Sequence, residues 1–238
     1  MLGWFRKMPK PVAVVTGGYH GNLGPIWCET LRSMGYVVFV IDLPHYDVAD
    51  LSSVEVARSK CLMRYGVPEV IVNNAAIDNP PGSGASFFGN FDRIMDVNLT
   101  GAVNVCDVFL PFMVREKRGL IVNVGSIMGN IGADWKNYKP GFEKPVGYNC
   151  SKAALIQLSR SITTQYGRHG IRSATMAFGP YASDKLLKDQ EFLGKFLEKV
   201  PLKTTITEKS LVNTLKFIIE TPEFAGQQVL VDAGYTAW

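Results

Sequence analysis

Short apolar runs alternate along the chain with longer segments in which apolar residues recur every three or four positions. Six runs rich in β-branched residues are bounded by Gly, Asn or Pro, as is typical of strands buried on both faces. They are PVAVVTG, YVVFVID, EVIVNNA, GLIVNVGS, IRSATMAFG and QQVLVDAG. Between them, helical periodicity falls near residues 22–34, 52–65, 90–117, 147–167 and 207–220. This alternation predicts an α/β fold, a doubly wound parallel sheet with helices on both faces in three α/β/α layers.

The segment 181–206 has a weaker pattern, in which charged and apolar residues are mixed. We interpret it as short helices and loop that form a mobile flap. No repeat, low-complexity tract or linker divides the chain, and 238 residues suffice for one large core. The sequence therefore predicts a single domain over residues 1–238.

The composition is that of a compact globular protein. Hydrophobic residues make up 47% of the chain and charged residues 19%, and the net charge is +4. Basic residues form no stripe interleaved with aromatics, so a nucleic-acid partner is not expected. The start, MLGWFRKMPK, includes Arg6 and Lys7 but lacks the continuous apolar region and cleavage site of a secretory signal. No apolar run approaches the roughly 20 residues of a membrane span, so we expect a cytoplasmic protein without a membrane partner.

The residues that commonly bind metals are dispersed. Cys28, Cys61, Cys106 and Cys150 are widely spaced, and the three histidines are equally scattered. Without a C-x-x-C pair or a His cluster, the sequence suggests neither a metal site nor a disulfide framework. A reducing compartment is the default for such cysteine usage.

A glycine-rich turn follows the first predicted strand and opens the first predicted helix. Such a turn lets the backbone approach a diphosphate closely, and the helix N-terminus then offers free N–H groups to it. Glycine is also common in tight turns for ordinary conformational reasons, but a strand before and a helix after the turn are typical of a dinucleotide site. The candidate cofactor-binding residues are Gly17, Gly18, Gly21, Asn22, Leu23 and Gly24.

Asp42 ends the second predicted strand. A carboxylate at this position can accept hydrogen bonds from both hydroxyls of an adenosine ribose, and it would repel a 2′-phosphate. The glycine turn contains no Arg or Lys to bind that phosphate. We therefore expect NAD rather than NADP as the cofactor, the alternative being that Asp42 is only a turn residue at the end of a strand.

Three further segments contain residues suited to acid–base chemistry. Tyr148 and Lys152 are four positions apart at the start of a predicted helix, which places them one turn apart on the same face. Asn98 falls on the apolar stripe of its helix, and Ser126 ends a strand at the edge where open α/β folds bind ligands. Each alone has an ordinary interpretation: a surface pair, a hydrogen-bonded core amide and a turn residue.

The ordered set of motifs is more specific than any member of it. TGGYHGNLG, NNAA at 73–76, VNLTG at 97–101, VNVGS at 122–126, YNCSK and the closing VDAGYTAW follow one another in that order. Over almost the whole chain they resemble the short-chain dehydrogenase/reductase family, in its short single-domain form. The resemblance implies a Rossmann fold and an oxidoreductase that transfers a hydride between a nicotinamide cofactor and a carbonyl/alcohol substrate. The residues that it implies are a catalytic tetrad of Asn98, Ser126, Tyr148 and Lys152, and cofactor contacts from Asn74, Ala75, Ala76, Tyr148 and Lys152.

The chemistry explains why these residue types are needed. Hydride delivery to a carbonyl leaves charge on its oxygen, so a proton must be supplied. A phenol with a pKa near 10 is a slow base for the reverse reaction, and a nearby ammonium should lower that pKa. We expect this role for Lys152 beside Tyr148, together with binding of the nicotinamide ribose. Ser126 would donate a hydrogen bond to the reacting oxygen, and Asn98 would hold a water that links Lys152 to solvent.

The first departures from the family pattern lie around the cofactor. The pattern T-G-x-x-x-G-x-G fits as far as Gly21, but its last glycine comes one place late, at Gly24. Counted from Gly18, the spacing matches that of longer sugar-nucleotide-modifying relatives. Only four residues separate Asp42 from Asp47. Asp47 and Val48 resemble the family segment that contacts adenine, so they are candidate cofactor-binding residues. We therefore expect the family's helix between its second and third strands to be missing and its third strand to be vestigial.

Other departures lie on the nicotinamide and substrate side. The family's Pro-Gly after its sixth strand appears here as Phe178-Gly179, and the Thr that often contacts the carboxamide is missing. The resemblance implies cofactor contacts from Gly179 and from Ser183, which we expect to take the place of that Thr. Between Ser126 and Tyr148 the loop is long and contains three aromatic residues and three lysines. Such a loop favours a sugar or an anionic, phosphorylated or nucleotide-linked substrate. Alternatively, it is an exposed loop or an oligomer contact.

Two other functions are alternatives for this chain. A sugar-nucleotide epimerase or dehydratase shares the Tyr-x-x-x-Lys motif, but usually adds a C-terminal substrate domain for which this chain has no room. A sensor or scaffold that binds NAD without turnover would not need the intact tetrad. The helices at 90–117 and 147–167 resemble those through which relatives pair, so a homodimer or homotetramer is expected.

Overall fold

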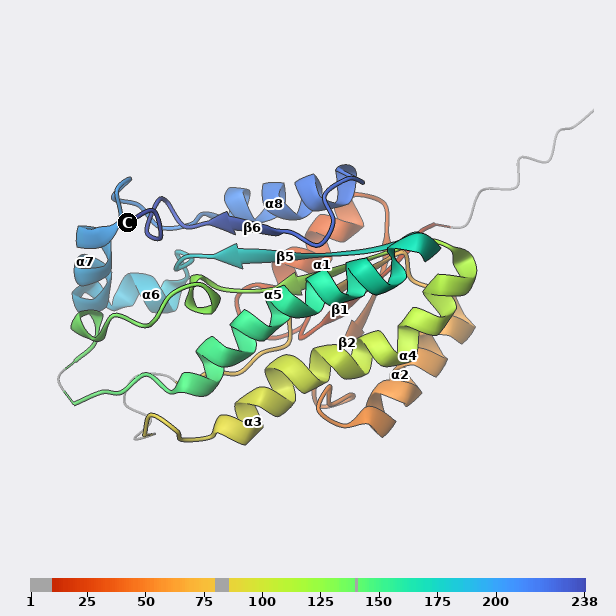
Figure 1. The fold of residues 1–238 in the computed structure, drawn as a ribbon, viewed down its shortest axis with the longest axis horizontal. Helices are drawn as coiled ribbons and strands as arrows, with labels where there is room; N and C mark the ends of the chain where they lie inside the picture. Colours follow the sequence, from red (N-terminus) through yellow and green to blue (C-terminus); the bar gives the residue numbers. More distant parts are fainter. Residues whose placement is uncertain (1–9, 80–85, 140) are drawn as a thin grey trace, which may run out of the picture.

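The computed structural model describes residues 10–79, 86–139 and 141–238. Arg6 and Lys7 of the basic start, and Pro140 of the long loop, lie outside the described residues. Six parallel strands form one sheet in the order β2-β1-β3-β4-β5-β6 (Figure 1). The strands are β1 (Val12–Thr16), β2 (Val37–Ile41), β3 (Val70–Asn73), β4 (Gly119–Val124), β5 (Ile171–Phe178) and β6 (Gln228–Val231). All six predicted strands are confirmed, and the order reverses between β1 and β3, as in a doubly wound sheet.

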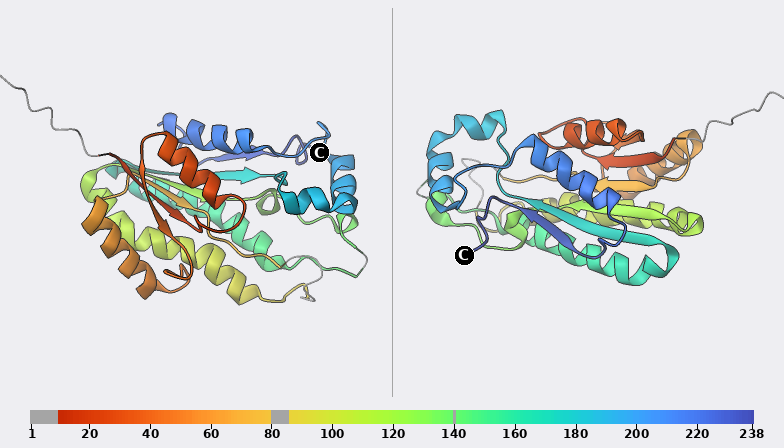
Figure 2. Two further views of the ribbon diagram at one scale, coloured as in Figure 1. Left: turned by 180° about the vertical axis from the view of Figure 1, so that it is seen from behind. Right: turned by 90° about the horizontal axis from the view of Figure 1, so that it is seen from above.

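Helices cover both faces of the sheet, and each face has its own apolar core (Figure 2). One face packs on α1 (Gly24–Ser33) and α8 (Glu208–Glu220). The other packs on α2 (Leu51–Tyr65), α4 (Gly101–Glu116) and α5 (Val146–Tyr166). In β1, Val12 and Val14 point into the second core and Ala13 and Val15 into the first, which is why this strand is continuously apolar.

The connection from β2 to α2 is shorter than in the family pattern, as the sequence indicated. Residues 42–50 contain turns and neither helix nor strand, so β2 is the edge of the sheet. The predicted loss of the helix is confirmed, but the expected remnant of the next strand does not form. Asp47 and Asp50 use their side chains locally instead: Asp47 accepts from the N–H of Ala49 at 2.9 Å, and Asp50 caps α2 through the N–H of Ser52 at 3.0 Å.

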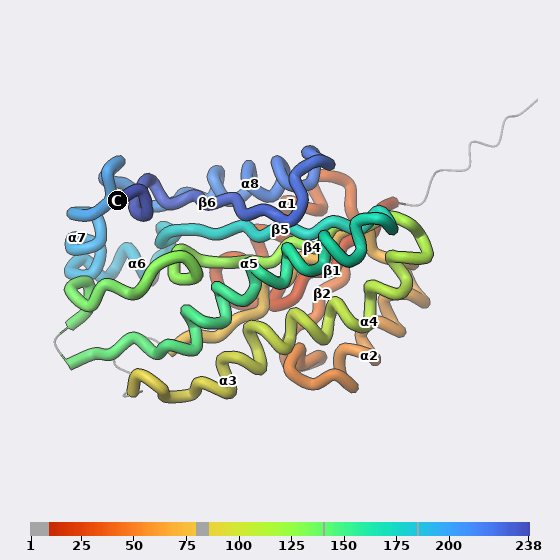
Figure 3. Tube along the Cα trace, in the orientation of Figure 1, coloured from red at the N-terminus to blue at the C-terminus, as the bar shows by residue number. Residues whose placement is uncertain are grey.

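The run from α3 (Phe91–Met95) to α4 is continuous, and Figure 3 shows it beside α5. By length and composition, Phe91–Glu116 is long and apolar enough to cross a membrane, contrary to the expectation that no apolar run approaches a membrane span. More than half of its most apolar window is buried in the fold, so burial in the core accounts for its apolar residues. A π-helical turn at Asp96–Thr100 joins the two helices and places Asn98 in the interior. Turns of this kind are frequent at functional sites.

The segment 181–206 forms two short helices, α6 (Asp184–Lys188) and α7 (Gln190–Lys199), as predicted. A third apolar cluster fixes α7, since the ring of Phe196 stacks on that of Tyr235 with centroids 4.6 Å apart. The Tyr235 hydroxyl also accepts a hydrogen bond from the Asn137 amide at 3.1 Å. The C-terminal segment therefore holds α7 and the long loop together, and the mobility of this region stays a prediction.

Candidate active site

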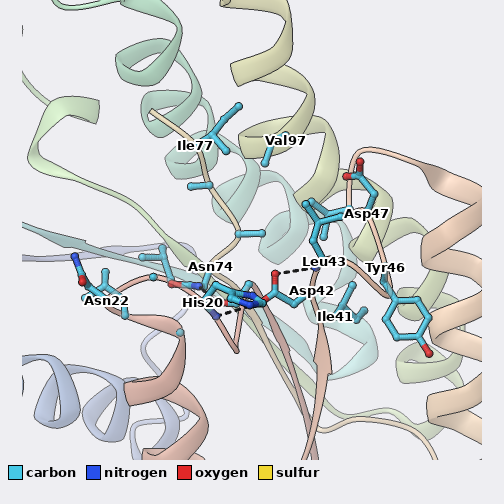
Figure 4. A pocket seen from close by; sticks show the side chains of 18 of the residues that line it. His20, Asn22, Ile41, Asp42, Leu43, Tyr46, Asp47, Asn74, Ile77 and Val97 are labelled. Atoms are coloured by element: carbon cyan, nitrogen blue, oxygen red, sulfur yellow. Dashed lines mark hydrogen bonds and ion pairs between the residues drawn. The ribbon is translucent and has the colours of Figure 1, made fainter. Parts of the chain in front are cut away.

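A cavity of about 380 Å³ lies at the carboxyl ends of β1 to β4, at the point where the strand order reverses. Figure 4 shows it lined by side chains from the glycine turn, the end of β2 and the segments after β3. Most of the predicted cofactor-binding residues line it: Gly17, Gly21, Asn22, Leu23, Gly24, Asp42, Asp47, Val48, Asn74, Ala75, Ala76, Tyr148 and Lys152. The sequence motifs thus converge on a single cavity.

The glycine turn has the shape that a diphosphate requires. Gly17 and Gly21 have φ angles of 62° and 76°, a region that other residues adopt rarely. A Cβ at Gly21 would meet nothing within 4 Å, whereas a Cβ at Gly24 would lie 1.9 Å from the Gly17 carbonyl oxygen. Gly21 therefore leaves open space in the cavity, and Gly24 lets α1 begin in contact with the turn. No side chain caps the N-terminus of α1 at Leu23, so its N–H groups fit an anionic ligand.

Gly18 has a packing role beside the one predicted. It does not line the cavity, and a Cβ there would lie 2.9 Å from both Cys28 Sγ and Val40 Cγ1. The absence of a side chain at Gly18 lets the turn pack between α1 and β2. Its contact with the cofactor stays a prediction.

Asn74 holds the glycine turn in place. Its amide nitrogen donates to the carbonyl oxygens of Thr16 and Gly17, both at 3.0 Å, and its oxygen accepts from Trp27 Nε1 at 2.9 Å. These bonds use both amide hydrogens. Asn74 therefore lines the cavity but supports it mainly by fixing the backbone of the turn.

Asp42 is anchored against the glycine turn. Its carboxylate accepts from the N–H groups of Tyr19 at 2.9 Å and Leu43 at 2.9 Å. The His20 ring nitrogen Nδ1 lies 3.2 Å from the same carboxylate (Figure 4). Sequence reasoning missed His20, although its place inside the glycine turn could have indicated it. These bonds orient the carboxylate at the wall of the cavity, where the ribose hydroxyls of a dinucleotide would lie.

Arg93 is a second unpredicted residue of this cavity. It comes from α3, and its guanidinium lies 3.7 Å from the carboxylate of Asp47. No local pattern places α3 against the segment after β2, so the sequence gave no signal for this pair. Asp47, a predicted adenine contact, therefore lies beside a cation at the rim of the cavity.

A second cavity, of about 280 Å³, adjoins the first. The two share Asn22, Leu23, Gly125 and Tyr148. Ser126 and Gly179 line only the second cavity, and Lys152 lines only the first. Tyr148 therefore lies where the two cavities meet. The first is called the cofactor cavity below, and the second the substrate cavity.

Ser183, proposed from the sequence as a carboxamide contact, lies in neither cavity. Its hydroxyl accepts from the N–H of Leu186 at 3.4 Å and caps α6. An N-cap is a common use of serine at the start of a helix. The contact of Ser183 with the carboxamide stays a prediction.

Tyr148 and Lys152 lie one turn apart on α5, as their spacing predicts. The Nζ of Lys152 is 5.5 Å from the centre of the Tyr148 ring and donates to the Val124 carbonyl oxygen at 2.7 Å. The Lys152 side chain is buried, and this bond orients its amine beneath the cofactor cavity. The loop after β4, which contains Ser126, and helix α5 thus bring three members of the predicted tetrad together.

The prediction that Lys152 lowers the pKa of Tyr148 is wrong for this structure. Burial raises the pKa of Tyr148 to about 12, the Asp78 carboxylate raises it further, and hydrogen bonding with Ser126 opposes both. Burial also lowers the pKa of Lys152 to about 8, against the attraction of Asp78. Desolvation is the largest cause of both shifts, because a phenolate and an ammonium are each disfavoured away from water. Tyr148 is therefore held in its neutral form, which carries a proton.

Asn98 is a fully bonded interior amide. Its oxygen accepts from the N–H of Ile77 at 2.7 Å, and its nitrogen donates to the Ile77 carbonyl at 3.0 Å and to Ser151 Oγ at 3.1 Å. Asn98 thus ties the segment after β3 to α5, close to the residues above. Its water-holding role stays a prediction, and within the described ranges no three His, Cys, Asp or Glu side chains gather as a metal site would require.

Comparison with known proteins identifies the class that this fold and site define. A family model described as enoyl-(acyl carrier protein) reductase matches residues 32–236. Galactitol 2-dehydrogenase of Rhizobium johnstonii is 30% identical over 254 residues, which cover 95% of each chain. 2-(R)-hydroxypropyl-CoM dehydrogenase of Xanthobacter autotrophicus is 27% identical over 199 residues, 80% of this chain and 76% of that one.

The solved structures agree on the fold. A gluconate 5-dehydrogenase from Burkholderia cenocepacia, in complex with NADP and tartrate, superposes with a TM-score of 0.81 at 21% identity and 96% coverage of both chains. The chain therefore belongs to the short-chain dehydrogenase/reductase family. It is an NAD(P)-dependent oxidoreductase that transfers a hydride between the nicotinamide and an alcohol or carbonyl substrate.

Proposed function

We propose that Tyr148 supplies the proton to the carbonyl oxygen during reduction and removes it during alcohol oxidation. The observation that carries this proposal is the position of Tyr148 at the junction of the two cavities, with Ser126 on one side and Lys152 on the other. A nicotinamide cofactor bound in the first cavity would supply or accept the hydride. A neutral phenol within reach of the substrate oxygen is suited to act as a general acid.

The neighbouring groups support this transfer. Ser126 lies in the substrate cavity, where its hydroxyl can donate to the oxygen on which charge develops. The Lys152 amine, oriented by the Val124 carbonyl, faces the cofactor cavity, where it would hold the nicotinamide ribose. The glycine turn and the N-terminus of α1 would hold the diphosphate. Asp42 would hold the adenosine ribose.

The cofactor is NAD in this proposal. Asp42 supports the preference because its carboxylate is fixed at the cavity wall and would repel a 2′-phosphate. We expect NADH to bind at least about tenfold more tightly than NADPH, a difference of about 1.4 kcal/mol. Titration of nicotinamide fluorescence with each cofactor measures it, and tighter binding of NADPH would overturn the role of Asp42.

The isosteric variant Asp42→Asn tests the cause of the preference. It keeps the shape but removes the negative charge, so NADPH affinity should rise until the two cofactors bind within about threefold of each other. Asp107→Asn, on the exposed side of α4, is the matched control and should leave the preference unchanged.

The substrate class in this proposal is a sugar or polyol with an anionic group. Ser126, Tyr138 and Lys144 line the substrate cavity, and Tyr138 also borders an outer cavity of about 500 Å³ with Trp135 and three lysines. The lysines are Lys136, Lys139 and Lys195. The galactitol dehydrogenase that this chain resembles acts on a polyol, as its name states.

A panel of neutral and phosphorylated polyols tests the substrate class. The double variant Lys136→Ser, Lys139→Ser should raise KM for phosphorylated substrates by about three- to tenfold, because exposed charges contribute up to about 1 kcal/mol each. KM for neutral polyols should stay unchanged in the same variant. An equal loss on both substrate types would show that the lysines do not bind the anion.

A further inference from the structure

We propose that Asp78 and Lys144 form a positioning pair that sets the electrostatic environment of the Tyr148 ring and so controls the pH range of turnover. The inference rests on the proposed role of Tyr148 as proton donor and acceptor. It assigns a function to two residues that lie outside the predicted tetrad. Both residues line the substrate cavity.

The pair lies directly against the reactive phenol. Lys144 precedes α5 by two residues, and its amine makes an ion pair with the Asp78 carboxylate, which follows β3. The Lys144 Nζ is also 4.9 Å from the centre of the Tyr148 ring, closer than the Nζ of Lys152 at 5.5 Å. The Tyr148 ring therefore has an amine near it from each of two segments, one of them already paired with a carboxylate.

Partial burial strengthens the electrostatic effect of Asp78 and Lys144 on their surroundings. The Lys144 side chain is only 11% exposed and that of Asp78 34%, so solvent screens the pair less than it screens a surface pair. The Asp78 carboxylate raises the pKa of both Tyr148 and Lys152. While both partners are charged, the Lys144 cation offsets the Asp78 anion at the phenol.

Few other charged or titratable groups face Tyr148. Lys152 approaches from α5, and Tyr138 approaches from the loop after β4, where burial raises its own pKa to about 12. On the cofactor side the cavity also contains Arg93, which is paired with Asp47, and His20, whose ring nitrogen lies 3.2 Å from the Asp42 carboxylate. Among the described residues, Asp78 is the carboxylate that raises the pKa of Tyr148, and Lys144 is the cation paired with it.

Removing either partner should move the pH dependence in opposite directions. Asp78→Asn removes the carboxylate and leaves the Lys144 cation over the ring, which favours the phenolate. Lys144→Met leaves the Asp78 carboxylate unbalanced, which disfavours the phenolate. Alcohol oxidation needs the phenolate as base, so its kcat rises with pH. This rising limb of the pH profile should move to lower pH in Asp78→Asn and to higher pH in Lys144→Met.

The test measures kcat of alcohol oxidation with saturating NAD between pH 6 and 10.5. We expect each single variant to shift the limb by about one pH unit, the low end for a charge within 4–6 Å. At a pH below the limb this is about a tenfold rise in kcat for Asp78→Asn and a similar fall for Lys144→Met. The double variant should return to within about half a unit of the wild type, and Lys144→Arg should restore the wild-type profile.

Glu69→Gln is the matched control, because Glu69 pairs with Arg118 at 3.2 Å outside both cavities. This variant should leave the pH profile of kcat unchanged. Profiles of Asp78→Asn and Lys144→Met that superpose on the wild type, with only KM changed, would overturn the inference and leave the pair a cavity wall. A failure of the proposed proton transfer by Tyr148 would be distinguishable from this result, because Tyr148→Phe would then retain turnover.

Discussion

Tyr148→Phe should lower kcat in both directions by about a thousandfold, while the Kd for NADH changes by less than about threefold. The phenol hydroxyl is the group that carries the proton, and loss of a positioned acid or base costs about 10² to 10⁴ in rate. The ring itself stays in place, so the walls of both cavities are preserved. Turnover followed by nicotinamide absorbance, and binding followed by its fluorescence, separate the two effects.

Tyr166→Phe is the control for this substitution, because it makes the same change near the other end of α5, away from both cavities. Its activity should equal that of the wild type. Tyr148→Phe with more than about a tenth of wild-type kcat would show that another group donates the proton. Loss of NADH binding in the same variant would instead show that the hydroxyl mainly supports the cofactor.

Lys152→Met should abolish useful turnover and yet stabilise the fold at neutral pH. Lys152 is 3% exposed, and burial lowers the pKa of its amine from 10.5 to about 8. Between these values the unfolded chain binds more protons than the folded one, so wild-type stability rises with pH there. Below pH 8 the folded state carries the full cost of the buried cation, on the order of 3 kcal/mol.

Methionine removes that cost but also loses the hydrogen bond to the Val124 carbonyl, worth about 1 kcal/mol. We therefore expect the free energy of unfolding at pH 7 to rise by about 1–2 kcal/mol in Lys152→Met, with the gain disappearing above pH 10. Urea denaturation at pH 7 and pH 10 measures this difference. A variant less stable than the wild type at pH 7 would contradict the account of Lys152 as a cation buried at the expense of stability.

The fold could be predicted almost completely because its signals are local. Strands buried on both faces are continuously apolar, and surface helices repeat every three to four residues, so β1 to β6 and the long helices all lie where the pattern placed them. Within the site, helical spacing predicted that Tyr148 and Lys152 share one face, whereas their catalytic role was predicted from the resemblance of the ordered motifs to the family. The π-helical turn at Asn98 was not predictable, since no residue type specifies it.

What could not be predicted depends on contacts between distant segments. The Asp78–Lys144 pair joins the segment after β3 to the segment before α5, and the sequence shows only an acid and a lysine 66 residues apart. The sign of the Tyr148 pKa shift was also predicted wrongly, because helical spacing shows the nearby ammonium but neither the burial of the phenol nor the Asp78 carboxylate, both of which raise that pKa.

The central claim is that Tyr148 is neutral at physiological pH and gives its proton to the carbonyl oxygen. The pH dependence of both directions, measured on the wild-type protein between pH 6 and 10.5, tests it most directly. We predict that kcat for carbonyl reduction is constant to above about pH 9, while kcat for alcohol oxidation rises about tenfold per unit through neutrality. A reduction rate that already falls with an apparent pKa near 7 would contradict the claim.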